Sequence, residues 1–203
     1  MPFTEVQIAN MALGRVGIQQ TISSLSSASS ESRQCNLFYE PARDAVLRDF
    51  PWPFARQYVS LALVSEFAST DDAVSHWAFA YRVPADCITC RRIVSPLGRN
   101  SPSPISFELG HDSGGLLIYC DVADPVLEYT ARFTDPAFFA ADFAMALSWR
   151  LAVEIAMPLA VSAGLRQSAE SEYRIAISRA QATALNEAQR DPDPESEFIR
   201  IRG

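Results

Sequence analysis

The sequence contains one arrangement that suggests nucleophilic catalysis. Ser113 lies within Asp112-Ser113-Gly114-Gly115, and His111 directly precedes this segment. A catalytic serine needs a histidine that accepts its proton and a carboxylate that orients the histidine. The chain has two histidines, and the other one is His76, upstream of the segment. A hydrolase that uses Ser113 with His76 or His111 is therefore one hypothesis.

The context of Ser113 favours a structural role instead. Chymotrypsin-like proteases, whose nucleophile lies in a similar D-S-G-G segment, have two β-barrels and carry their histidine far upstream in its own motif. Here Ser113 is followed by two predicted strands and then by helices. Residues 111–115 therefore predict a β-hairpin loop, and we expect no enzymatic activity.

Cysteine chemistry is the second possibility. Cys87 and Cys90 have the spacing of a zinc knuckle or a redox pair. A structural zinc site needs four ligands, and the remaining cysteines, Cys35 and Cys120, are isolated in the sequence. A redox motif of the thioredoxin type would open a helix, whereas Cys90 leads into a predicted strand. The sequence thus favours buried or half-buried thiols on a strand pair, and we expect no metal or cofactor.

Composition limits the partners that this chain can have. Of its 203 residues, 48% are hydrophobic and 20% are charged, as in ordinary globular domains. The net charge is −7 and all 17 basic residues are arginine. An acidic chain is a poor match for tight binding to phosphate. We also expect no signal peptide and no membrane-spanning helix.

Hydrophobic periodicity predicts helices at both ends of the chain. The expected helices are 4–17, 31–50, 136–157 and 164–189. Thr4 and Gln7 form a capping box, and Asp135 with Pro136 forms a cap and a first helical position. Pro41 is expected to kink or split the second helix.

The middle of the chain predicts strands. Short segments rich in β-branched and aromatic residues lie at 57–64, 77–84, 90–96, 105–110, 116–122 and 125–133. The aromatic residues of 50–54 and 77–81 are interpreted as core rather than as a stacking platform. The expected fold is α+β and mainly helical, with two N-terminal and two C-terminal helices. The expected domains are a discontinuous helical domain (1–56 and 134–190), an antiparallel β insertion (57–133) and an extended C-terminal tail (191–203).

The C-terminal tail combines a stiff acidic part with an apolar-basic part. Two prolines in 191–195 prevent a helix, and Phe198 and Ile199 are followed by alternating Arg200, Ile201 and Arg202. Disordered termini are usually polar throughout. This pattern therefore favours docking on a sheet edge or in a groove of another chain over simple disorder.

The order of these features resembles a known family. The opening I-A-N-M-A-L-G-R-V-G-I (8–18) is followed by a serine-rich loop, by the helix 31–50 and by F-P-W-P-F (50–54). Near the end, Tyr173, Ala176 and Ala180 fit a Y-x-x-A-x-x-x-A helix, before the acidic and apolar-basic tail. This order is similar to that of the head-to-tail adaptor proteins of tailed bacteriophages, in particular the tail tubular protein A group of short-tailed phages.

The resemblance implies a structural virion protein at the head–tail junction, made in the host cytoplasm. Such adaptors form a ring, usually of twelve copies, between the portal protein and the next tail component (the nozzle or its equivalent). DNA passes through the channel without specific binding. The residues implied for binding the portal or a neighbouring subunit are Glu195, Phe198, Ile199, Arg200, Ile201 and Arg202. The residues that we expect to face the next tail component are Arg99, Asn100, His111, Asp112 and Ser113. A non-viral protein-interaction scaffold is the alternative.

Overall fold

The architecture is mixed α+β. A computed structural model describes residues 2–67, 76–94, 104–159 and 161–187. Within these ranges, 46% of the residues are helical and 24% lie in strands, in four α-helices and seven strands that form two antiparallel sheets. The prediction of a mainly helical fold is therefore wrong. The prediction underestimated the strand content of the middle of the chain. The strands there form two sheets with a hydrophobic core of their own. The predicted domain boundaries stay a prediction.

Helix α1 (Glu5–Arg15) has both of its ends capped by local sequence. At the N-terminus, the predicted capping box is confirmed: the Thr4 hydroxyl accepts the Gln7 N–H, and the Gln7 side chain accepts the Thr4 N–H. At the C-terminus, Gly17 adopts a left-handed φ of 80°. The Ile18 N–H then bonds the Leu13 carbonyl at 3.0 Å, which closes a Schellman motif.

Helix α2 (Ser30–Asp49) continues through Pro41, so the predicted split does not occur. Proline removes one helical N–H and leaves the carbonyl four residues earlier, that of Leu37, without its donor. Leu37 and Pro41 are both exposed. Water can therefore satisfy this carbonyl, and the helix tolerates the proline.

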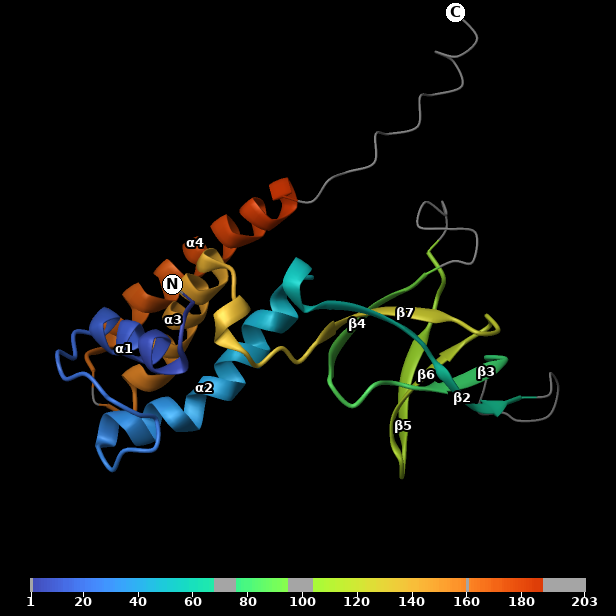
Figure 1. The fold of residues 1–203 in the computed structure, drawn as a ribbon, viewed down its shortest axis with the longest axis horizontal. Helices are drawn as coiled ribbons and strands as arrows, with labels where there is room; N and C mark the ends of the chain where they lie inside the picture. The colour runs from blue at the N-terminus through green and yellow to red at the C-terminus, as the bar shows by residue number, and fades with distance from the viewer. Residues whose placement is uncertain (1, 68–75, 95–103, 160, 188–203) are drawn as a thin grey trace, which may run out of the picture.

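Helix α3 (Ala141–Ala156) is the centre of the helical core. It packs against α1, α2 and α4 (Ala163–Glu187), and nine of its residues are buried (Figure 1). The predicted cap at Asp135 belongs to a preceding 3-10 helix, Pro136–Phe138, where the Asp135 carboxylate accepts the Ala137 N–H. Helix α3 itself begins after Ala140, which provides no side-chain cap.

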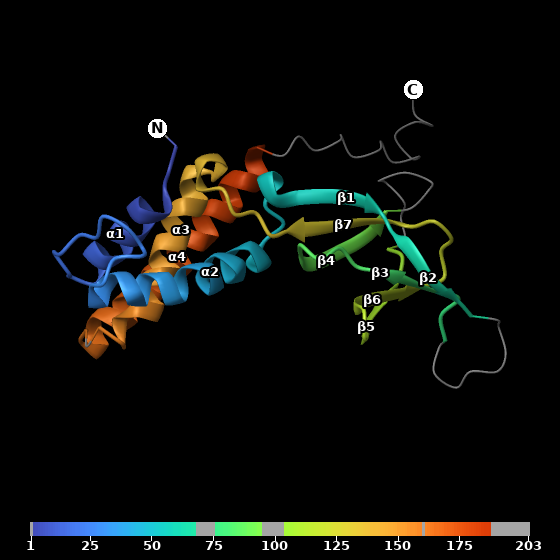
Figure 2. The same cartoon turned by 60° about the horizontal axis from the view of Figure 1, so that its bottom comes forward.

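The seven strands form two sheets. Their bounds are β1 Arg56–Ser60, β2 Ala62–Glu66, β3 Phe79–Arg82, β4 Cys87–Val94, β5 Glu108–Asp112, β6 Gly115–Cys120 and β7 Val126–Ala131. The first sheet has the order β1-β7-β4 and the second has the order β2-β3-β6-β5, with every neighbouring pair antiparallel. β1, β4 and β7 lie next to the helices, and the second sheet lies farther away (Figure 2).

One predicted strand is divided between the two sheets. The segment 57–64 was expected to be continuous, but it separates at Leu61 into β1 and β2. Leu61 is buried in the core between the sheets, and its N–H bonds the Pro125 carbonyl at 3.0 Å. The chain thus passes from one sheet to the other at Leu61, and this short segment contributes an edge strand to each sheet.

The C-terminal end of α2 joins the helices to the first sheet. The side chain of Arg91, on β4, reaches this end: its Nη2 donates to the carbonyls of Arg48 (2.9 Å) and Leu47 (3.3 Å). Its Nε donates to the Thr130 hydroxyl at 2.9 Å on β7. The preceding carbonyl, that of Val46, accepts the Trp52 indole N–H at 2.8 Å. Side chains from outside the helix therefore satisfy three of its last carbonyls.

We expect the Arg91→Met substitution to lower the free energy of unfolding by about 1–3 kcal/mol, because the partly buried Leu47 carbonyl and Thr130 hydroxyl lose their donor. Urea denaturation would measure the change. The matched control is Arg48→Met, since Arg48 is exposed at the same helix end and should change stability by less than about 0.5 kcal/mol. Equal effects of the two substitutions would contradict the role of Arg91.

Candidate docking site

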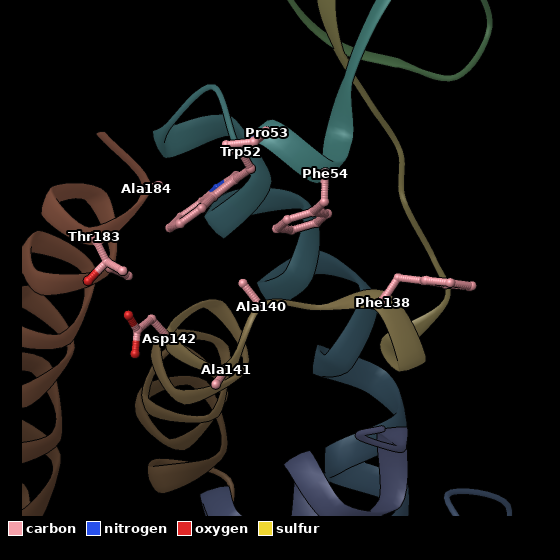
Figure 3. A pocket seen from close by; sticks show the side chains of 10 residues that line it. Trp52, Pro53, Phe54, Phe138, Ala140, Ala141, Asp142, Thr183 and Ala184 are labelled. Atoms are coloured by element: carbon pink, nitrogen blue, oxygen red, sulfur yellow. The ribbon is translucent and has the colours of Figure 1, made fainter. Parts of the chain in front are cut away.

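A groove opens where η1 (Pro53–Ala55), the start of α3 and the last turns of α4 meet (Figure 3). Its volume is about 280 Å³ and its lining is mostly apolar. The lining residues are Trp52, Pro53, Phe54, Phe138, Ala140, Ala141, Asp142, Ala180, Thr183 and Ala184. Because alanines occupy the helix faces, the groove is open enough to accept larger apolar side chains from another segment.

The aromatic floor of the groove is held rigidly. The Trp52 ring is fully buried and makes an edge contact with Phe143 at 5.0 Å between centroids. Phe54 meets Phe143 at 5.0 Å and Phe139 at 5.8 Å. With its indole N–H bound to the Val46 carbonyl, Trp52 has a fixed orientation. The groove therefore lies over a packed aromatic cluster that keeps its shape when a ligand docks.

The rim of the groove carries one free carboxylate. Asp142 lies in the first turn of α3, where a negative charge complements the helix dipole. Among the described residues, its side chain makes no hydrogen bond or ion pair, and it is exposed. Thr183 faces it from α4, but the Thr183 hydroxyl donates to the Arg179 carbonyl (Figure 3). Asp142 is therefore the group that would attract a cation to this groove.

The predicted hairpin around Ser113 is confirmed. β5 and β6 pair up to Asp112 and Gly115, with Ser113 and Gly114 at the exposed turn. Gly115 has a φ of 126°, which favours glycine at this position. The Asp112 carboxylate accepts two bonds from Arg82, at 2.6 and 2.8 Å, and a third from the Gly114 N–H. Because of these three hydrogen bonds, the Asp112 carboxylate is part of the turn structure.

The geometry does not assemble a catalytic serine. Within the described ranges, Ser113 has no hydrogen bond to His76 or His111, and both histidines are exposed. Asp112 orients Arg82 rather than an imidazole. The remaining residues expected to face the next tail component, Arg99 and Asn100, lie outside the described residues, as do Glu195, Phe198, Ile199, Arg200, Ile201 and Arg202 of the tail.

The four cysteines are free thiols in two kinds of environment. Cys35 and Cys120 are fully buried, whereas Cys87 and Cys90 are half-buried and lie 3.7 Å apart, sulfur to sulfur. No group of three or more His, Cys, Asp or Glu side chains in the described part of the chain is arranged to hold a metal ion. No helix among the same residues is long and apolar enough to cross a membrane.

The groove was not predicted from the sequence. The aromatic residues at 50–54 were interpreted as core, and Trp52 is indeed buried. That interpretation did not foresee that Trp52 also lines a groove together with Ala180 and Ala184. The alanines of the long helix α4 were the available signal. Neither a protein-family model nor a curated protein sequence matches this chain.

The Arg82 guanidinium holds the pKa of the Asp112 carboxyl at about 2, below its usual 3.8. A lowered carboxyl pKa stabilises the hairpin above pH 3.8, and this contribution is lost as the pH falls from 3.8 towards 2. An NMR titration should give this value, and Arg82→Gln should return it towards 3.8. An Asp112 pKa that is unaffected by Arg82→Gln would contradict the assigned cause.

We expect a fluorophosphonate probe to leave Ser113 unlabelled, because no base activates its hydroxyl. Intact-protein mass spectrometry would show the adduct, and Ser113→Ala is the control. Stoichiometric labelling that disappears in Ser113→Ala would restore the hydrolase hypothesis.

Proposed function

We propose that this chain is a non-catalytic subunit of a ring-shaped adaptor of the bacteriophage head–tail type. The observation that carries the proposal is the position of the groove at the end of α4. Ala180, Thr183 and Ala184 line it, and α4 ends at Glu187, so the last described helical residue lies within one turn of the groove and four residues before the tail at 191. With the groove and the tail close together in the sequence, the tail of each copy can bind the groove of the next copy.

The chemistry of the tail suits the groove. Phe198, Ile199 and Ile201 provide apolar side chains for an aromatic and alanine-lined surface. Arg200 or Arg202 would then lie near the free carboxylate of Asp142. Apolar anchors inside a pocket, with a charge pair at the rim, give affinity and register respectively.

The reach of the tail supports docking on a neighbour. Ten residues lie between Glu187 and Phe198, and the eleven residue steps span about 36 Å in an extended chain. This reach is long enough for the tail to leave its own helical domain, and docking on an adjacent copy is the proposed use of it. Head-to-tail contacts that repeat with a fixed rotation close into a ring, and twelve copies is the number implied by the resemblance.

The remaining surfaces have proposed roles in the same assembly. The tail would contact the portal protein as well as the neighbour, and the hairpin at His111, Asp112 and Ser113 would face the next tail component. The net charge of −7 suits a channel through which DNA slides without being held. A non-viral scaffold that binds a foreign peptide in the groove is the alternative that the same geometry allows.

We expect light scattering and negative-stain microscopy to detect rings of about twelve copies, either with the chain alone or after mixing with a candidate portal protein. A chain truncated at residue 190 should keep its fold by circular dichroism and lose assembly. A persistent monomer under both conditions would contradict the adaptor function, and unchanged assembly of the truncated chain would contradict the role of the tail.

A charge exchange tests the groove itself. We expect Asp142→Arg to weaken assembly about fivefold, the value of a rim ion pair of about 1 kcal/mol. Combination with Arg200→Glu and Arg202→Glu should recover most of the loss. Glu172→Arg, an exposed change on the same helical body but away from the groove, is the matched control. If the combined variant assembles no better than Asp142→Arg, the tail does not dock in this groove.

A further inference from the structure

The two half-buried thiols lie on the same face of β4 because the strand is bulged. In a regular strand, residues three apart point to opposite faces. Here Cys87 pairs with Ala131 and Cys90 pairs with Tyr129, so one residue between the cysteines has no counterpart on β7. Ala131 and Tyr129 are two residues apart and share a face, and the cysteines opposite them therefore share a face too.

The bulge has a structural cause. Ile88 packs against the core of the helices, whereas Cys87 and Cys90 pack against the core of the sheets. The insertion of Ile88 into the helical core thus turns the strand and brings the two thiols together. Their sulfur atoms lie 3.7 Å apart. A disulfide requires about 2.05 Å, so side-chain rotation over less than 2 Å would close it.

The thiol pair is accessible from one side. Cys87 borders an open cavity of about 550 Å³, together with residues of β1, β2 and the β5–β6 hairpin. Pro84 and Leu116 lie on the same wall. A small thiol reagent can therefore reach Cys87 from this cavity without unfolding of the sheet, and Cys90 is itself partly exposed.

The two sulfur atoms differ in acidity. The thiols of Cys87 and Cys90 share a hydrogen bond in which either sulfur can donate, and this hydrogen bond lowers the pKa of Cys90. The pKa of Cys87 is raised by the same hydrogen bond, by burial and by the negative charge of Asp86. Cys90 therefore forms the thiolate first, and the thiolate is the nucleophile in thiol–disulfide exchange.

The other two cysteines provide an internal contrast. Cys35 and Cys120 have no exposed surface. Burial raises the pKa of Cys35 to about 11 and also raises the pKa of Cys120. Both should remain reduced when Cys87 and Cys90 react.

We propose that Cys87 and Cys90 form a reversible disulfide within β4 by exchange with a low-molecular-weight disulfide such as oxidised glutathione. The Cys90 thiolate attacks one glutathione sulfur, which forms a mixed disulfide and releases one glutathione thiolate. That thiolate takes the Cys87 proton, and Cys87 then attacks the Cys90 sulfur and expels the second glutathione. The two protein thiols are oxidised and one glutathione disulfide is reduced to two thiols.

The proposed disulfide would lie next to a residue that joins the sheets to the helices. Arg91 follows Cys90 directly, and its side chain holds the end of α2. Arg91 itself lies in a second irregularity of β4, between Cys90 and Arg92, so it stands beside the disulfide and outside the bulge that the disulfide would span.

The test is equilibration of the full chain with graded ratios of reduced and oxidised glutathione. We expect intact mass to fall by two hydrogens, peptide mapping to find Cys87 linked to Cys90, and Cys35 and Cys120 to stay alkylatable after unfolding. Excess reduced glutathione should reverse the change. Absence of the link at every ratio, or its failure to reverse, would overturn the proposal.

Single substitutions test the order of attack. We expect Cys87→Ser to accumulate a glutathione adduct on Cys90, because the second thiol is missing. Cys90→Ser should react at Cys87 at least about tenfold more slowly. Cys120→Ser is the control and should still form the link, and circular dichroism would establish that each variant folds. Equal adduct formation by the first two variants would overturn the assignment of Cys90 as the nucleophile.

Discussion

The fold depends on how the last carbonyls of α2 are satisfied. Phe50-Pro51 stops the helix without a glycine cap, which leaves the carbonyls of the final turn without helical donors. The donors come from two distant places: the indole of Trp52 and the guanidinium of Arg91. Because Arg91 lies on β4, the end of α2 and the first sheet can only be completed together. The joint between helices and sheets is therefore part of the core rather than a flexible linker.

The same joint positions the groove and the pair of thiols. Trp52 closes the end of α2 with its N–H and provides the floor of the groove with its ring face. On the other side, Ile88 enters the helical core and produces the bulge that brings Cys87 and Cys90 together. The docking groove and the thiol pair have unrelated chemistry, yet both result from the packing of the end of α2 against the first sheet. Movement at the joint would change both.

Local sequence signals predicted the parts of the fold that local interactions determine. The Thr4–Gln7 capping box and the β-hairpin at 111–115 are both confirmed. The share of strand, the crossing at Leu61 and the groove were missed. Each of these depends on contacts between segments far apart in the chain, and hydrophobic periodicity contains no information about which segments meet. The tail residues of the candidate site stay a prediction because they lie outside the described residues.

The use of arginine as the sole basic residue type has a structural reason in these contacts. Glu128, buried on β7, is paired with Arg92 of β4 and lies 3.4 Å from Arg56 of β1, so one carboxylate links all three strands of the first sheet. Arg82 binds both oxygens of Asp112. Arg91 uses Nε and Nη2 in different directions, towards a hydroxyl and two carbonyls. A lysine ammonium is a single point donor and reproduces none of these forked geometries. The arginines therefore fix the relative positions of strands and helix, beyond balancing charge.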